Sequence, residues 1–201
     1  MSRVVTISAS YGAGGSWVGP QVAEQLGWRF VDRAIPVQVA ERLDVPVEHA
    51  EVHDEAAAPR FTRLLARIPN TSGMVVPEAT TDAFCRETER LLTDAADAGE
   101  VVVLGRAGAI VLRDRSDALH VRLDGPEEAR VSQGMRVENV DEDEARRRQR
   151  TSDRARIDYV KHFYRADPRD PHHYHVVLDS TAVALPTCVE LIVAAARAQS
   201  S

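Results

Sequence analysis

The feature that most constrains this chain is a glycine-rich turn between a strand-like run and a helix-like pattern. Val4-Val5-Thr6-Ile7-Ser8 is apolar and β-branched on both faces, as is typical of a central parallel strand. Tyr11-Gly12-Ala13-Gly14-Gly15-Ser16 follows, and apolar residues then recur at helical spacing until Gly27. Such an arrangement presents backbone N–H groups and a positive helix end to an anion. The sequence therefore predicts a phosphate-binding turn, with a purely structural tight turn as the alternative.

The spacing within the turn departs from two common nucleotide-binding motifs. The dinucleotide pattern G-x-G-x-x-G fails because Trp17 stands where its third glycine is needed. If Gly14 is the second glycine of the pattern G-x-x-x-x-G-K-[ST], Gly15 takes the lysine position and Ser16 the hydroxyl position. Lys161 is the only lysine in the chain. Phosphate charge must then be balanced by arginines from other segments, or the catalytic electrostatics are weak.

Strand-like and helix-like segments alternate along the rest of the chain. This alternation indicates a parallel sheet covered by helices on both faces. Proline-broken helical pieces between residues 34 and 73 are interpreted as an irregular helical insertion. The predicted strands are 4–8, 28–31, 101–104, 118–123 and 175–179, and the predicted helices after the first are 77–99, 127–137, 141–164 and 185–198.

Composition narrows the class of protein. Apolar residues make up 44% and charged residues 28% of the chain, which is a globular balance. A net charge of −6 argues against general nucleic-acid binding. No run is long enough to cross a membrane, and the amino terminus leads straight into a strand rather than a signal peptide, so we expect a cytoplasmic protein. Cys85 and Cys188 are far apart and are interpreted as ordinary buried thiols.

Four motifs in order resemble the cytidylate kinase-like family, a divergent branch of the P-loop nucleoside monophosphate kinases. They are residues 7–15, Phe30-Val31-Asp32-Arg33, Val103-Leu104-Gly105-Arg106 and Asp153-Arg154-Ala155-Arg156. The resemblance extends from residue 4 to about residue 192. It implies a three-layer P-loop NTPase-type α/β fold with a five-stranded parallel sheet of order 2-3-1-4-5. It also implies one domain with a core of residues 1–33, 77–127 and 172–201, an acceptor-binding helical insertion at about 34–76 and a lid at about 128–171.

The resemblance also assigns roles to particular side chains. Arg106 matches the arginine that grips the acceptor phosphate, and Asp153 and Arg156 match the lid motif that contacts the acceptor nucleotide and the phosphates. Arg130 resembles an arginine found where the lid begins. The predicted catalytic residues are Arg106, Arg130, Arg150, Asp153 and Arg156; the cofactor-binding residues are Gly12, Ala13, Gly14, Gly15, Ser16 and Trp17; the substrate-binding residues are Asp32, Arg33, Arg106 and Asp153; and Ser16 is the predicted magnesium ligand.

Several of these residues have structural alternatives. Ser16 is also a candidate N-cap of the first helix, and Asp32 a candidate cap of the helix that follows it. Trp17 packs under the turn or approaches a base. The arginines from 146 to 156 form either a catalytic face or a solvated surface paired with Asp141, Glu142 and Glu144. The histidines at 172, 173 and 175 favour an exposed loop over a metal site.

The leading hypothesis is an enzyme that moves the γ-phosphoryl group of ATP, with Mg²⁺, to a nucleoside monophosphate, CMP or dCMP first. The alternative is a catalytically weak or inactive nucleotide-binding or regulatory protein on the same scaffold, because the P-loop lysine is absent. A kinase for a non-nucleotide acceptor is a third hypothesis, since the divergent insertion would set acceptor choice. The predicted partners are small-molecule nucleotides, with no nucleic acid or membrane, and a homo-oligomer is left open.

Overall fold

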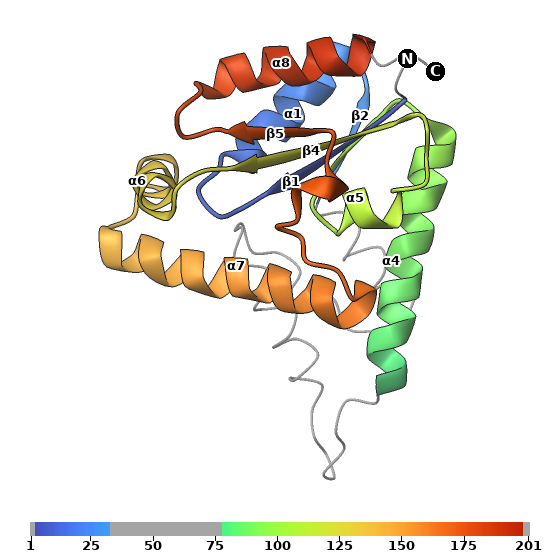
Figure 1. Cartoon of the computed structure of the whole chain (residues 1–201), viewed down its shortest axis with the longest axis horizontal. Coiled ribbons are helices and arrows are strands. Elements are labelled where there is room, and N and C mark those ends of the chain that lie inside the picture. Colours follow the sequence, from blue (N-terminus) through green and yellow to red (C-terminus); the bar gives the residue numbers. More distant parts are fainter. Residues whose placement is uncertain (1–2, 33–77, 199–201) are drawn as a thin grey trace.

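A parallel five-stranded sheet of order β2-β3-β1-β4-β5 forms the centre of the computed structural model, which describes residues 3–32 and 78–198 (Figure 1). The central strand β1 lies between β3 and β4, so its carboxyl end opens in the middle of one sheet edge. This order confirms the predicted fold class. The strands are β1 (Val4–Ala9), β2 (Arg29–Val31), β3 (Val101–Leu104), β4 (Ala118–Asp124) and β5 (Val176–Asp179).

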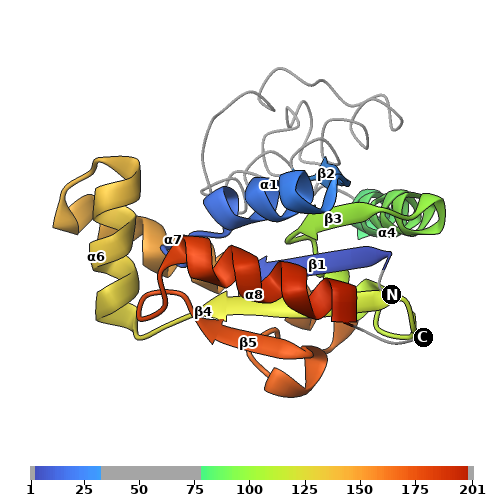
Figure 2. The same cartoon turned by 90° about the horizontal axis from the view of Figure 1, so that it is seen from above.

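Helices cover both faces of the sheet and its carboxyl edge. The helices α1 (Gly15–Leu26) and α8 (Leu185–Ala198) pack together on one face, while α4 (Glu78–Ala98) and α5 (Gly108–Val111) pack on the other. Beyond the arrowheads of β1 and β4 lies α6 (Glu127–Glu138) (Figure 2). It packs against α7 (Glu142–Tyr164), which leads to a short 3-10 helix η1 (Pro171–His173).

The hydrophobic core has two parts because strand side chains alternate between the two sheet faces. On one face Val5 and Ile7, each at most 1% exposed, pack with residues of α1 and α8 such as Val22. On the other face Val4 and Val101 pack with residues of α4. Burial on both faces explains why β1 is a nearly continuous apolar run.

Glycines end two of the helices, and an acidic residue caps the start of another. Gly27 ends α1 in a left-handed conformation, with φ of 72°, and its N–H bonds back to the carbonyls of Ala23 and Glu24. Gly99 adopts the same conformation after α4. The Asp141 carboxylate caps α7 by accepting a hydrogen bond from the Glu144 N–H at 2.8 Å. The predicted strands and long helices therefore lie within a residue or two of the observed ones.

Two short elements were not predicted, namely α5 and η1, because one helical turn carries no periodic pattern. The predicted acceptor insertion at 34–76 and Arg33 lie outside the described residues. Cys85 and Cys188 are buried and unpaired with each other, as expected for two structural thiols. None of the helices within residues 3–32 and 78–198 is long and apolar enough to span a membrane.

Candidate functional site

The glycine turn connects β1 to α1 at the carboxyl edge of the sheet. Gly12 and Gly14 both adopt a left-handed backbone, with φ of 73° and 76°. Glycine is also required sterically at position 12, since a Cβ there would lie 2.0 Å from the carbonyl oxygen of Arg130. Gly14 is the N-cap of α1, and no side chain among the described residues caps this helix. The turn therefore leads directly into an open helix amino terminus.

The backbone N–H groups at the start of α1 have no hydrogen-bond partner in the part of the chain that the structure describes. Within the described residues, the N–H groups of Gly14, Gly15 and Ser16 donate no hydrogen bond. Gly14 and Gly15 are nevertheless buried. Buried N–H groups are rarely left unpaired, and a row of them at a helix amino terminus is a site for an anion.

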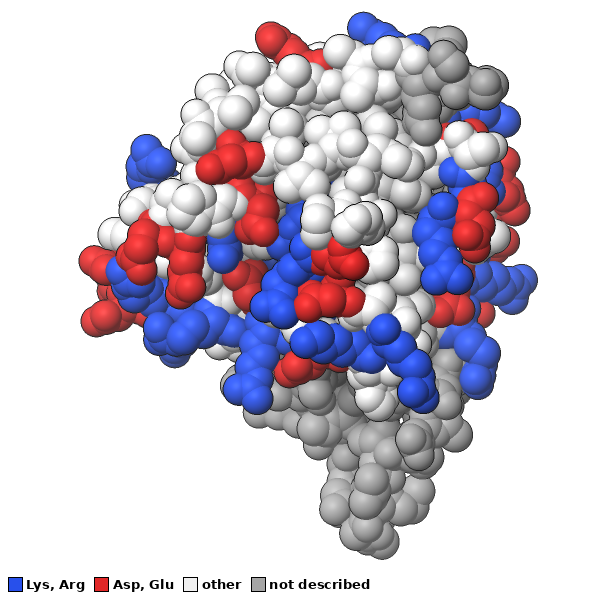
Figure 3. All heavy atoms as spheres, viewed as in Figure 1, with Lys and Arg blue, Asp and Glu red and all other residues white. Residues whose placement is uncertain are grey.

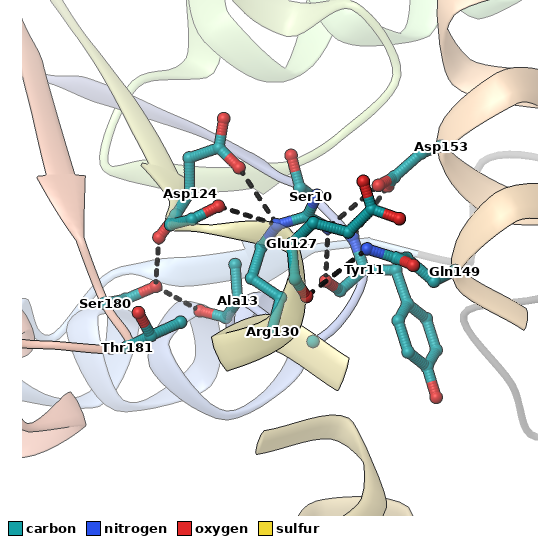
Figure 4. A network of polar contacts seen from close by, with 12 residues as sticks. Ser10, Tyr11, Ala13, Asp124, Glu127, Arg130, Gln149, Asp153, Ser180 and Thr181 are labelled. Carbon is teal, nitrogen blue, oxygen red and sulfur yellow. Dashed lines mark hydrogen bonds and ion pairs between the residues drawn. The ribbon is translucent and has the colours of Figure 1, made fainter. Parts of the chain in front are cut away.

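The first three carbonyl groups of the turn, in contrast, accept hydrogen bonds from side chains of other segments. Arg130 Nη1 donates to the Tyr11 carbonyl at 2.8 Å, and Gln133 Nε2 donates to the Gly12 carbonyl at 2.9 Å. Ser180 Oγ donates to the Ala13 carbonyl at 2.7 Å (Figure 4). Side chains from α6 and from the residue after β5 thus hold the outer side of the turn.

Arg130 is a buried link between the turn, β4 and α7. Its Nε donates to the Gly125 carbonyl at 3.0 Å and lies 3.3 Å from Asp124 Oδ1. Its Nη1 is 2.8 Å from Asp153 Oδ2. The side chain is only 10% exposed, and its Nε and Nη1 are directed at protein groups (Figure 4). The direct catalytic contact of Arg130 stays a prediction.

Asp153 lies on α7 and is likewise committed to protein contacts. Its Oδ1 accepts a hydrogen bond from the Tyr11 N–H at 2.9 Å, while Oδ2 pairs with Arg130. Arg156 follows one helical turn later, with Nη1 3.5 Å from Asp153 Oδ1. That nitrogen is buried and has no hydrogen-bond partner in the described part of the chain. Arg156 therefore retains donor capacity beside the turn.

Arg122 and Asp124 form a second buried pair at the end of β4. Arg122 Nη2 lies 2.6 Å from Asp124 Oδ2, and it also donates to Ser10 Oγ at 3.1 Å. Burial alone would raise the pKa of the Asp124 carboxyl, but hydrogen bonding and the charge of Arg122 outweigh burial and lower it. Asp124 is therefore held as a carboxylate.

Arg106 follows β3 at the same edge of the sheet. It is half-buried and adopts a left-handed backbone with φ of 57°. Burial raises the pKa of Tyr159 on α7 to about 12, with the nearby Cys85 adding to the rise and the positive charge of Arg106 opposing it. Arg106 consequently lies close enough to Tyr159 on α7 for its charge to act on that side chain.

The other arginines of α7 divide between the two interpretations. Arg146 pairs with Glu128 and Glu142, Arg147 pairs with Glu144, and Arg148 pairs with Glu138 and Glu144. Basic and acidic side chains alternate along this face of the molecule (Figure 3). Residues 146–148 therefore match the second interpretation, a solvated surface of ion pairs. Arg150 is exposed and makes no ion pair within the described residues.

Ser16 is the second residue of α1, so the N-cap alternative is wrong, and Gly14 holds that position. No group of three or more His, Cys, Asp or Glu side chains in the described regions is placed to hold a metal ion. Mg²⁺ usually keeps several waters and takes only one or two protein oxygens beside phosphate oxygens. The half-buried Ser16 hydroxyl fits that limited demand.

The structure also places Trp17, Asp32 and the histidines before β5. Trp17 is 41% exposed, so it does not pack under the turn. Asp32 is half-buried directly after β2, and the helix it was a candidate to cap lies outside the described residues. The histidines before β5 build no metal cluster: His172 pairs with Asp170, and the His175 ring stacks on His120.

Sequence reasoning assigned no role in the site to Arg122 or Gln133. Arg122 carried a usable signal, because it is an arginine between two apolar residues of a buried strand. Gln133 carried none, since a polar residue on a surface-like helix gives no hint of a partner 121 positions away. Ser180 directly follows β5, and no sequence signal marked its bond to the turn.

The parallel order β2-β3-β1-β4-β5, with a glycine turn leading from the central strand into α1, defines the three-layer fold of P-loop kinases. A model of the cytidylate kinase-like family matches residues 4–182, and the chain belongs to that family. A cytidylate kinase from Methanopyrus kandleri is 31% identical over 103 residues, which cover 47% of this chain. The match spans about half of the relative's length, 53%.

Solved structures agree on the fold. An uncharacterized protein from Eubacterium ventriosum superposes with a TM-score of 0.70 at 15% identity, covering 97% of this chain and 98% of its own. A gluconokinase from Sinorhizobium meliloti gives 0.54 at 16% identity, covering 96% and 91%. A shikimate kinase from Acinetobacter baumannii in complex with shikimate gives 0.50 at 14% identity, covering 96% and 94%. These likenesses identify the fold, while the acceptors in their names remain those of the neighbours.

Proposed function

We propose that this protein is a nucleoside monophosphate kinase that transfers the γ-phosphoryl group of ATP to CMP or dCMP in the cytoplasm. The observation that carries the proposal is the row of N–H groups at the buried Gly14 and Gly15 and the half-buried Ser16, which have no partner within the described residues. The phosphate oxygens of a nucleoside triphosphate would accept hydrogen bonds from these N–H groups. Membership of the cytidylate kinase-like family supports the choice of acceptor.

In this proposal, two arginines bind the acceptor phosphate and stabilise the charge of the transferring group. An oxygen of the acceptor phosphate attacks the γ-phosphorus of ATP, the bond to the bridging oxygen breaks, and ADP leaves with that oxygen. Arg106 grips the acceptor phosphate at the end of β3. Arg156, whose buried Nη1 has no hydrogen-bond partner within the described residues, stabilises the charge on the transferring group. Positioning and charge stabilisation of this kind account for most catalysis of phosphoryl transfer.

Mg²⁺ would neutralise charge on the ATP phosphates, with the Ser16 hydroxyl as its protein ligand. The turn itself contributes backbone dipoles rather than cationic side chains. Gly15 occupies the position of the P-loop lysine, and the nearby Arg130 and Arg122 are each paired with a carboxylate. In this proposal the magnesium ion, Arg106 and Arg156 supply positive charge beside the phosphates.

A second candidate is a nucleotide-binding protein with weak or no phosphotransfer. The specific observation in its favour is the Asp153 carboxylate, which is bonded to the Tyr11 N–H in the turn that would hold the phosphates. A negative charge beside a phosphate site opposes the build-up of charge that the transfer requires.

One assay distinguishes the candidates. The purified protein is incubated with ATP, Mg²⁺ and each of CMP, dCMP, UMP, AMP, shikimate and gluconate, and ADP release is followed. The proposed enzyme gives ADP with CMP or dCMP well above the rate without acceptor. ATP binding without ADP from any acceptor would favour the silent nucleotide-binding protein, and ADP with shikimate or gluconate alone would favour a non-nucleotide kinase.

A further inference from the structure

The outer side of the glycine turn is held at three consecutive carbonyl groups. The donors are Arg130 for Tyr11, Gln133 for Gly12 and Ser180 for Ala13, at 2.7–2.9 Å. All three donor residues are buried: Arg130 is 8% exposed, Gln133 is 9% and Ser180 is 1%. These bonds are shielded from water, which favours their persistence in the unliganded protein.

The side chain of Tyr11 adds a fourth attachment, to α6. It is 1% exposed, and its hydroxyl donates to Glu138 Oε2 at 3.0 Å. The ring lies over Gly134, where a Cβ would approach the ring carbon Cε1 to 2.8 Å. The turn is therefore attached to α6 by backbone and side chain together.

Because a peptide group is rigid, these bonds to the carbonyls also fix the direction of the N–H groups on the inner side of the turn. In a trans peptide the C=O and the following N–H point in opposite directions within one rigid plane. A held Ala13 carbonyl therefore directs the Gly14 N–H to the other side, and a held Tyr11 carbonyl does the same for the Gly12 N–H. Gly14 belongs to the row of N–H groups that has no partner within the described residues.

We infer that Arg130, Gln133 and Ser180 are positioning residues that hold the glycine turn in its phosphate-binding shape before any ligand arrives, with Asp153 fixing Arg130 in place. They act on the carbonyl side and do not touch the phosphates. The inference rests on the proposed function only for the identity of the ligand. It also gives α6 a role in binding, since this helix cannot swing away as part of the predicted lid without releasing the turn.

Two neutral substitutions test the inference, Gln133→Ala and Ser180→Ala, because each removes one donor and leaves every charge unchanged. Ser132→Ala is the matched control: Ser132 is exposed on α6, and its hydroxyl donates to the Glu128 carbonyl within the same helix. Dissociation constants for ATP with Mg²⁺ are measured by calorimetry on proteins whose thermal unfolding remains cooperative. Hydrogen exchange at the amides of residues 11–16 is followed in the absence of ligand.

Each of the two variants is expected to bind ATP about fivefold more weakly, as the loss of one neutral hydrogen bond lowers the population of the binding-competent turn. Their amides in residues 11–16 should exchange faster while those of β1 and β4 do not, and Ser132→Ala should match the wild type in both. Unchanged ATP affinity or unchanged exchange in the turn of Gln133→Ala and Ser180→Ala would overturn the inference. If the wild type itself binds no ATP, the proposed function fails, whereas faster exchange confined to the turn of the two variants would still support the positioning role.

Discussion

Three consecutive residues after β3 adopt a left-handed backbone, and the middle one is a predicted catalytic residue. Gly105, Arg106 and Ala107 have φ of 76°, 57° and 53°. Glycine tolerates this conformation, but each of the other two residues costs about 1 kcal/mol there. Strain of this kind is commonly stored where a side chain must be aimed at a ligand. Arg106, at the carboxyl edge of the sheet, fits that description.

We expect Arg106→Ala to raise the KM for CMP by about 10- to 100-fold, because a bidentate, charge-assisted contact to the acceptor phosphate is lost. The dissociation constant for ATP should change less than about twofold. Arg106→Gly relaxes the backbone and also lacks the guanidinium, so it should resemble Arg106→Ala in steady-state kinetics. An equal loss of ATP binding and acceptor use in both variants would contradict the assigned role.

At the scale of single elements, α7 depends on its cap because it carries many charges and few buried residues. Asp141 satisfies one of the free N–H groups at its start, from Glu144, and a chain of acids follows in the first turn. Asp153 and Arg156 are positioned by this helix. Its stability therefore bears directly on the candidate site.

Asp141→Ala should lower the free energy of unfolding by about 1 kcal/mol, since the N-cap hydrogen bond is lost. For a chain of this length the melting temperature should fall by about 2–4 °C, as calorimetry would measure. Asp143→Ala removes an acid from the same first turn without removing the cap, and should cost less than half as much. A larger effect of Asp143→Ala would assign the stabilisation to charge rather than to capping.

Elements were predictable where the signal is local. The β-branched run of β1 and the glycines at 27 and 99 placed strands and helix ends within a residue or two. The candidate site was predictable only in part. The glycine turn and the edge position of Arg106 follow from sequence order and the rules of parallel sheets. The burial of Arg130 does not, because its partners Asp124 and Asp153 depend on how α6 and α7 dock.

At the scale of the whole molecule, one buried histidine ties folding to pH. His120 on β4 is 2% exposed, and its Nδ1 lies 2.8 Å from Thr6 Oγ1 on β1. Burial lowers its pKa to about 4 from 6.5, and the neighbouring His175 contributes. The folded protein thus disfavours the protonated ring, whereas the unfolded chain accepts the proton near pH 6.5.

Stability should therefore fall as the pH drops from about 6.5 towards 4, because the unfolded chain binds more protons in that window. This one group should remove about 2 kcal/mol of the free energy of unfolding between pH 7 and pH 5. Urea denaturation of the wild type and of His120→Gln at both pH values isolates the contribution. The variant should lose about 2 kcal/mol less than the wild type across the interval, even if it is less stable at both ends.

The matched control for that experiment is His172→Gln, because the His172 side chain is 90% exposed. It should keep most of the wild-type pH dependence, because it leaves His120 and its contacts with Thr6 and His175 unchanged. If His120→Gln loses stability as steeply as the wild type between pH 7 and pH 5, the acid sensitivity comes from other groups. In that case the buried contact between β1 and β4 tolerates the charged ring, and the sheet centre is more hydrated than its burial indicates.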